Sequence, residues 1–166
     1  LIGLGHQHIL LFVHRSVKPH CSVPERQRGY RAAMEEAGLP IRECMQVPEE
    51  DAIDILVRGN ARPTGVVCYS NLEATLIVHA MWQYGVSLPG DLSVIAFNDI
   101  FAVRYMTPPL TTVGYDAAKI GELGAELVLR EIHGSENGQH PKVLSIKPRL
   151  HVRGSTGPAP QREGSA

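Results

Sequence analysis

Short apolar runs alternate along the chain with longer stretches in which apolar residues recur every three or four positions. The short runs predict strands at residues 9–13, 41–47, 65–69, 92–97 and, with a less regular pattern, 143–151. The longer stretches predict helices at residues 22–37, 49–58, 70–84 and 116–132. Strands separated by helices of this length are typical of an α/β fold, with a doubly wound, mainly parallel sheet and helices on both faces.

The first predicted helix has recognisable signals at both ends. Ser22 and Glu25 have the spacing of a capping box, and Pro24 falls in the first turn. Gly38 stands where a residue in the left-handed conformation ends a helix. Arg26 therefore lies in the first turn, near the sheet edge at which ligands bind in such folds.

The strand predicted at residues 92–97 is followed by two polar residues, Asn98 and Asp99. In an open parallel sheet, the residues just past the carboxyl end of a strand line the crevice in which ligands bind. Asn98 therefore faces a candidate pocket.

Four segments carry a family resemblance: LGHQHI at residues 4–9, PERQRGY at 24–30, TGVVCYSN at 64–71 and SLPGDLSVIAFNDIFAVRYMTPPLTTV at 87–113. In content and order they resemble the effector-binding domain of the LacI/GalR family of bacterial transcriptional repressors. The last segment has the proline, acid, strand, polar pair and TPPLTT run that are typical of this family. The resemblance as a whole, including the chain around these segments, spans roughly residues 1–153.

The resemblance implies a domain organisation. The effector module of the family has two periplasmic-binding-protein-like subdomains joined by three crossovers, with the ligand in the cleft between them. We expect residues 1–113 to form the second subdomain, and residues 114–153 to cross back and complete the first. Residues 154–166, rich in Gly, Pro and Ser, are expected to be a disordered tail. We also expect the chain to be a fragment, since family members begin with a helix-turn-helix headpiece, and removal of all residues after Val113 to improve its solubility.

Arg26 and Asn98 are the first candidates for effector binding. Arg26 matches the arginine with which family members hold the effector, and a guanidinium suits bidentate contacts with hydroxyls or a carboxylate. The alternative for Arg26 is a surface arginine in a solvated ion pair. Asn98 stands where the family usually has an aspartate, and its amide donates and accepts hydrogen bonds without a charge.

Further candidates surround these two. Ser70 either contacts the effector or caps the helix that follows, and Asn71 is expected to cap that helix. Tyr115 either stacks on a sugar face or fills the crossover, and Tyr69 is expected to line the floor of the cleft. We list the expected structural residues separately: Asp99 to cap the following turn through backbone N–H groups, and Pro108 and Pro109 to fix the crossover.

Composition excludes several classes of protein. Sixteen basic and seventeen acidic residues give a net charge of −1, so this segment has no basic surface typical of nucleic-acid binding. Three widely spaced cysteines without a CxxC pair argue against a disulfide framework and a zinc site, and fit a reducing, cytoplasmic location. No apolar run is long enough for a membrane span. The sequence shows no catalytic constellation, so we expect no enzyme, no metal and no cofactor.

The resemblance implies a ligand-sensing domain of a LacI-type regulator, which binds a small effector, a sugar or sugar derivative, and controls operator binding allosterically. We expect a homodimer that contacts operator DNA through a headpiece outside this sequence, and no membrane partner. The alternative is the periplasmic sugar-binding protein of an ABC transporter, which shares the fold. An α/β enzyme is a third class, disfavoured because no catalytic residues are visible.

Overall fold

The computed structural model describes residues 1–58, 62–133 and 144–161. Its strands are β1 (Ile9–His14), β2 (Glu43–Val47), β3 (Gly65–Cys68), β4 (Ser93–Phe97), β5 (Thr111–Gly114) and β6 (Arg149–His151). Its α-helices are α1 (Ser22–Glu36), α2 (Glu49–Arg58), α3 (Asn71–Gln83) and α4 (Ala117–His133). Two short 3-10 helices are η1 (Ile2–Leu4) and η2 (Phe101–Tyr105). Within the described ranges, no helix is long and apolar enough to cross a membrane.

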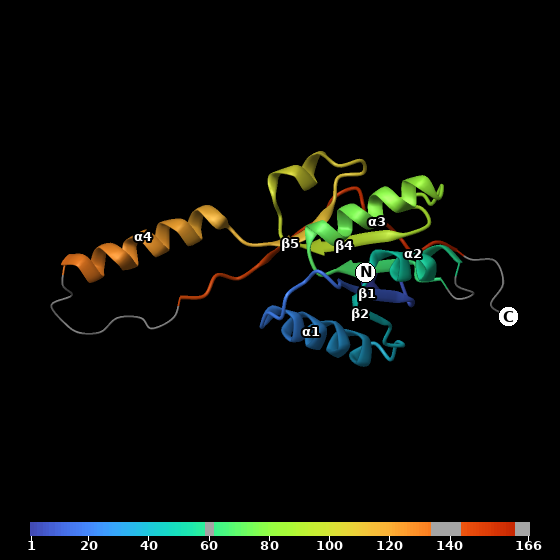
Figure 1. Cartoon of the computed structure of the whole chain (residues 1–166), viewed down its shortest axis with the longest axis horizontal. Coiled ribbons are helices and arrows are strands. Elements are labelled where there is room, and N and C mark those ends of the chain that lie inside the picture. Colours follow the sequence, from blue (N-terminus) through green and yellow to red (C-terminus); the bar gives the residue numbers. More distant parts are fainter. Residues whose placement is uncertain (59–61, 134–143, 162–166) are drawn as a thin grey trace.

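The six strands form one sheet in the order β2-β1-β3-β4-β5-β6 (Figure 1). The first five are parallel, and only β6 runs antiparallel to its neighbour β5. The predicted doubly wound, mainly parallel α/β fold is therefore confirmed. β5 was not predicted as a strand, because the Thr-Thr-Val run was assigned to a crossover. It instead pairs with β4 in register, Ile95 with Thr111.

One face of the sheet packs on α2 and α3. Leu10 and Phe12 of β1 point to this side, where they meet Leu56 of α2 and Ile77 and Met81 of α3. All five side chains are buried. Their hydrophobic contact fixes the two helices against the sheet.

The opposite face packs on α1, which Figure 1 shows on the other side of the sheet from α3. Ile9 and Leu11 alternate with the residues above and contact Tyr30 and Met34 of α1. The hydroxyl oxygen of Tyr30 lies 2.8 Å from the carbonyl oxygen of Ile9 and 2.9 Å from that of Arg42, so its hydrogen can be donated to either carbonyl. These contacts place the amino-terminal end of α1 beside the carboxyl edge of the sheet.

The two ends of α1 differ from each other in how well the sequence predicted them. Gly38 has φ of 65°, and the N–H of Leu39 reaches the carbonyl of Met34 at 2.8 Å, so the left-handed C-terminal signal is confirmed. The capping box is wrong: the cap position is Cys21, which makes no side-chain capping bond. Ser22 lies inside the helix, and its hydroxyl bonds the hydroxyl of Tyr69 at 2.8 Å.

Residues 154–161 belong to the tail that the composition predicts to be disordered, but they pack on the sheet. Ser155 is fully buried, accepts from the N–H of Thr111 at 2.8 Å and donates to the carbonyl of Val94 at 2.6 Å. His6 reaches the carbonyl of Gly157 at 3.0 Å. The composition did not predict this packing, because a few specific hydrogen bonds, rather than many apolar side chains, hold the segment on the sheet. Residues 162–166 of the predicted tail lie outside the described residues.

The strand predicted at residues 143–151 is shorter than expected. β6 contains only Arg149–His151 and joins the same sheet as β1 to β5. Residue 143 lies outside the described residues. Truncation after Val113 would remove β6 and the buried Ser155, which both pack on this sheet. This packing argues against the expectation that the truncation improves solubility.

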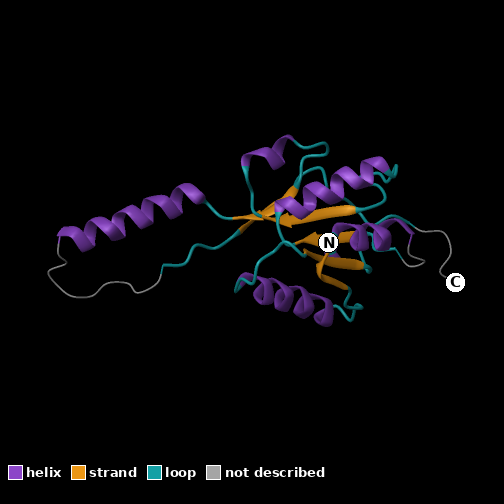
Figure 2. Ribbon diagram, viewed as in Figure 1, coloured by secondary structure: helices purple, strands orange, loops and turns teal. Residues whose placement is uncertain are grey.

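Helix α4 projects away from the sheet, and Figure 2 shows loop segments between it and the strands. None of its residues is buried, although apolar residues follow one another at helical spacing along it. Ile120, Val128 and Ile132 are all exposed. An apolar helix face without a covering surface indicates a contact with chain other than this sheet.

Candidate ligand-binding site

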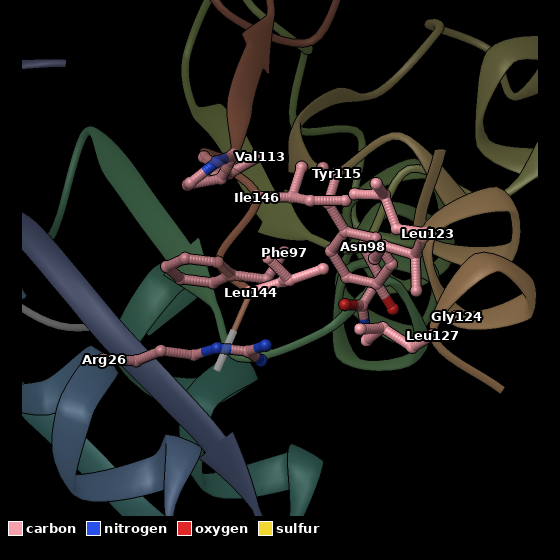
Figure 3. Close-up of a pocket in the computed structure, with 13 residues that line it drawn as sticks. Arg26, Phe97, Asn98, Val113, Tyr115, Leu123, Gly124, Leu127, Leu144 and Ile146 are labelled. Atoms are coloured by element: carbon pink, nitrogen blue, oxygen red, sulfur yellow. The ribbon is translucent and has the colours of Figure 1, made fainter. Parts of the chain in front are cut away.

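A cavity of about 540 Å³ lies past the carboxyl ends of β4 and β5. The sheet side contributes Arg26, Phe97, Asn98, Val113 and Tyr115, and the α4 side contributes Leu123, Leu127, Leu144 and Ile146 (Figure 3). This position is the one at which open parallel sheets bind ligands. Its size falls in the range of small-molecule sites, roughly 300–1,000 Å³.

Arg26 is held in place by aromatic residues at the cavity. Its guanidinium carbon lies 4.5 Å from the ring centre of Tyr69 and 4.3 Å from that of Phe97. Nη1 also donates to the carbonyl of Tyr69 at 2.5 Å. Since Tyr69 follows β3 and Phe97 ends β4, two neighbouring strands orient the guanidinium, whose head lies at the edge of the cavity in Figure 3.

The guanidinium of Arg26 makes no direct ion pair among the described residues. No carboxylate there lies within ion-pair distance of its guanidinium. Burial lowers the pKa of Arg26, and the nearby groups of Tyr69, Glu73 and Tyr115 oppose that shift. The arginine stays charged at neutral pH and is therefore a fixed cation. This arrangement differs from the alternative of a solvated surface ion pair.

Asn98 adopts an uncommon backbone conformation, with φ of 74°. Asparagine tolerates this left-handed region better than most residues other than glycine. Its N–H donates to the carbonyl of Val113 at 2.9 Å, so the turn continues the contact between β4 and β5. The amide side chain lines the cavity, as Figure 3 shows.

The prediction that Asp99 caps the following turn is wrong. Its side chain instead links three segments of the chain. Its carboxylate accepts from Thr112 of β5 at 2.8 Å, from Arg104 of η2 at 3.0 Å and from Arg153 at 2.7 Å. Burial would raise the pKa of Asp99, but the bonds from Thr112 and Arg153 outweigh it and lower the pKa. Its side chain is 5% exposed. Asp99 is thus structural, with side-chain partners rather than backbone ones.

Gly114 allows this close packing. A Cβ at Gly114 would lie 2.5 Å from the Cβ of Asp99, a distance that side chains do not tolerate. Any larger residue would displace Asp99 from Thr112 and Arg153. The prolines lie nearby: the carbonyl of Pro109 accepts from the N–H of Ser155 at 3.0 Å, and a Cβ at Gly154 would lie 3.3 Å from the Cβ of Pro108.

The remaining predicted site residues divide into two groups. Tyr115 lines the cavity, whereas Tyr69 does not and instead holds Arg26. Ser70 is the N-cap of α3, accepts from the N–H of Leu72 at 3.2 Å and donates to Glu73. Asn71 is the first residue of α3, so its expected role as the cap falls to Ser70.

Sequence reasoning missed Phe97 and the apolar half of the cavity. Phe97 could have been found, because it is the last residue of an alternating strand next to Asn98. Leu144 and Ile146 gave no such signal, since they follow a long stretch without clear periodicity. Elsewhere, no group of three or more His, Cys, Asp or Glu residues in the described ranges is placed to hold a metal, and Cys21, Cys44 and Cys68 are free.

This fold and cavity define a periplasmic-binding-protein-like ligand domain, and comparison with known proteins gives the same class. The model of the periplasmic binding protein-like domain family matches residues 1–156. The repressor PurR of Vibrio campbellii is 32% identical over 92% of this chain and 47% of its own length. The chain thus spans about half the length of the curated relatives it matches.

Solved structures of LacI family regulators have the same fold as this chain. A LacI family transcriptional regulator from Bifidobacterium animalis superposes with a TM-score of 0.81 at 25% identity, over 96% of this chain and 58% of that one. A LacI family regulator from Enterococcus faecium with bound ribose gives a TM-score of 0.77 at 26% identity, over 95% and 59%. The chain belongs to the periplasmic binding protein-like family, in the form found in LacI-family transcriptional regulators. The relatives named here are regulators rather than enzymes, as predicted.

Proposed function

We propose that this chain is the ligand-sensing part of a cytoplasmic, LacI-type transcriptional regulator that binds a small effector, a sugar or sugar derivative. The observation that carries the proposal is the guanidinium of Arg26, held between two aromatic rings at the edge of a 540 Å³ cavity. The ribose bound by the regulator from Enterococcus faecium supports this class of effector.

The uncovered apolar residues of α4 support a second wall for the cleft. In the proposal, α4 belongs to another subdomain, which buries residues such as Val128 and Ile132, whereas β6 stays in the sheet that contains β1 to β5. An effector held between Arg26 and that subdomain would favour one relative orientation of the two halves. Its binding would then change operator affinity by population shift.

DNA contact is proposed to come from a headpiece outside this sequence. The chain has a net charge of −1, which does not favour binding to phosphates. We therefore expect the 166-residue chain to give no sequence-specific shift of operator DNA in a mobility assay. A specific shift at submicromolar protein would contradict this part of the proposal.

A homodimer is also part of the proposal, and η2 offers a surface for it. Phe101 and Tyr105 are 73% and 71% exposed, and their rings lie 4.8 Å apart. Exposed aromatic pairs are typical of the centre of protein interfaces. Replacing both with Glu should shift the full-length protein to a monomer in sedimentation velocity, whereas Ile41→Glu, at the opposite edge of the sheet, should not.

The effector site is tested by calorimetric titration of the full-length protein with sugars, sugar phosphates and purines. Arg26→Ala should weaken the binding of the effector by roughly 10- to 1,000-fold, because it removes a charge-assisted contact of about 1.5–4 kcal/mol. Arg28→Ala is the matched control, since Arg28 is exposed on the same helix and pairs only locally with Glu25. Equal affinities of wild type and Arg26→Ala for the effector would contradict the proposal that the effector binds in this cavity.

A further inference from the structure

A second cluster of polar side chains lies at the carboxyl edge of the sheet, past β1 and β2 rather than past β4 and β5. β1 and β2 are parallel, and a bulge at Gln46 shifts their register so that His14 pairs with Val47. α2 begins at Glu49, just after β2. This pairing places the carboxylate of Glu49 beside the imidazole of His14, although the two residues are 35 positions apart in the sequence. Neither residue lines the 540 Å³ cavity.

The imidazole of His14 joins a hydroxyl to a carboxylate. Its Nδ1 lies 2.7 Å from Oγ of Ser16, and its Nε2 lies 2.9 Å from Oε2 of Glu49. The backbone N–H of Ser16 also donates to Nδ1, at 3.2 Å, so Nδ1 is the unprotonated nitrogen. Nε2 therefore carries the ring proton and donates it to Glu49, and the hydroxyl of Ser16 donates to Nδ1.

Burial differs along this chain of hydrogen bonds. The side chain of His14 is 14% exposed and that of Glu49 is 34% exposed. The backbone N–H of Glu49 and the bond from His14 lower the pKa of Glu49, which keeps its carboxylate ionised at neutral pH. Ser16 is exposed, because it lies in the turn that the N–H of Val17 closes on the carbonyl of His14 at 3.0 Å. A hydroxyl bonded to a neutral imidazole that a carboxylate orients is the arrangement that activates serine as a nucleophile.

A second histidine and serine have the same local geometry without the acid. Nδ1 of His20 lies 2.9 Å from Oγ of Ser22 and accepts from the N–H of Ser22 at 3.2 Å. Among the described residues, no carboxylate bonds the ring of His20, and the hydroxyl of Ser22 also bonds that of Tyr69. A local turn therefore explains the contact between hydroxyl and imidazole at both places. At Ser16 alone of the two serines, a carboxylate orients the base.

We propose that Ser16 is a covalent modification site for activated acyl compounds, such as acyl phosphates and aryl esters. Oγ of Ser16 attacks the acyl carbon and forms a new C–O bond, while Nδ1 of His14 takes the hydroxyl proton as general base. The bond from the acyl carbon to the leaving oxygen breaks, and the phosphate or phenolate departs with the electron pair. The imidazolium then returns its proton to water, and Ser16 retains the acyl group as an ester.

The surroundings of Ser16 favour modification over turnover. Its own N–H is bonded to His14, and the N–H of Val17 is bonded to the carbonyl of His14. These two donors are therefore not free to stabilise the oxyanion through which water would hydrolyse the ester. The exposed cations Arg15 and Lys18 lie on either side of Ser16 and favour an anionic donor, such as an acyl phosphate.

Acetylation of the full-length protein tests the proposal, with acetyl phosphate and p-nitrophenyl acetate as separate donors and mass spectrometry of the peptides as the measurement. Ser16 should be acetylated at least roughly 10-fold faster than Ser22, because general-base catalysis contributes about 100- to 10,000-fold when fully developed. His14→Gln should remove this advantage, whereas His20→Gln, the matched control, should leave the rate at Ser16 unchanged.

Glu49 is a positioning residue, and its role is tested separately. Glu49→Gln retains a hydrogen-bond acceptor but loses the charge, so it should slow acetylation of Ser16 about 10-fold with little change in melting temperature. Nitrogen NMR of the His14 ring should show the proton on Nε2 in wild type and on both nitrogens in exchange in Glu49→Gln. A proton on Nδ1 in wild type would overturn the proposal. So would acetylation of Ser16 that is indifferent to His14, or acetylation confined to amines such as that of Lys18.

Discussion

Helices α3 and α4 have comparable apolar content but opposite surroundings. α3 buries six of its thirteen residues, among them Ile77 and Met81, against the sheet. α4 has seventeen residues and buries none of them. Apolar residues at helical spacing predict that a helix has a surface to cover, but not which part of a protein covers it.

The difference also separates two parts of the molecule. Residues up to β5, together with β6 and residues 152–161, are tied by buried side chains and specific hydrogen bonds. Within the described residues, α4 buries none of its side chains, and a loop connects it to β5 (Figure 2). We expect changes of the same chemistry to have large effects in the first part and small effects in the second.

The largest effect is expected from removing residues 153–166. This truncation leaves the N–H of Thr111 and the N–H and carbonyl of Val94 without their partners in Ser155. Each unsatisfied buried group costs roughly 1–3 kcal/mol, a large part of a typical stability of about 5–15 kcal/mol. Thermal unfolding followed by circular dichroism should lose its cooperative transition. A transition unchanged from that of the intact chain would show that the segment only rests on the sheet.

The next largest difference in stability is expected between two Ile→Ala substitutions, one on α3 and one on α4. Ile77→Ala on α3 should lower the free energy of unfolding by about 2–5 kcal/mol, because Ile77 is fully buried. In the 166-residue chain, Ile132→Ala on α4 should change it by less than about 0.5 kcal/mol, because Ile132 is 70% exposed. Urea denaturation of both variants measures the difference. Similar losses would mean that α4 packs on the sheet in solution.

A smaller effect is expected at the acid that links β4, β5 and the C-terminal segment. Asp99→Asn should cost about 1–3 kcal/mol at pH 7, because it leaves Arg153 without its ion pair. The pKa of Asp99 is lowered in the folded state, so the wild type has this stability above about pH 4 and loses it as the pH falls through the lowered pKa.

The stability gap between wild type and Asp99→Asn should therefore stay constant down to about pH 4 and narrow as the pH falls further, as measured by urea denaturation. Glu126→Gln is the matched control on α4, where the exposed pair with Arg130 at 3.7 Å should contribute nothing measurable. A gap that does not narrow as the pH falls below about 4 would mean that the shape of Asp99, not its charge, matters.

The smallest effect concerns His6, whose ring bonds Thr64 at 2.9 Å and the carbonyl of Gly157. Burial lowers the pKa of His6, so the folded state takes up its proton less readily than the unfolded state, whose pKa is about 6.5. Stability is complete above that pH and falls as the pH decreases towards the lowered pKa. Melting temperatures between pH 7.5 and 5 should fall less in His6→Gln than in wild type, whereas His133→Gln on α4 should follow wild type.

Local signals in the sequence predicted much of the fold. The bounds of α2 agree with the prediction, and those of β1, β3, β4, α3 and α4 differ by one residue at most ends. These elements have clear periodicity and clear ends, so short-range physics fixes them. β5 and β6 are short, and their pairing depends on residues that are distant in sequence.

The candidate site was predicted less completely for the same reason. Arg26, Asn98 and Tyr115 could be placed near the carboxyl edge of the sheet, because chain order alone fixes that edge. The rings that hold Arg26 and the partners of Asp99 depend on the three-dimensional packing of separate strands. No pattern in the sequence predicts that Asp99 forms an ion pair with Arg153.

The last described residues lie against the first ones. The N–H of Ala159 donates to the carbonyl of Leu4 at 2.9 Å, and Gly157 meets the ring of His6. His6 and Gly157 are 151 residues apart in the sequence, and contacts of such long range form late in folding. The sheet end beside Leu4 and His6 therefore stays incompletely covered until residues 157–159 have been synthesised.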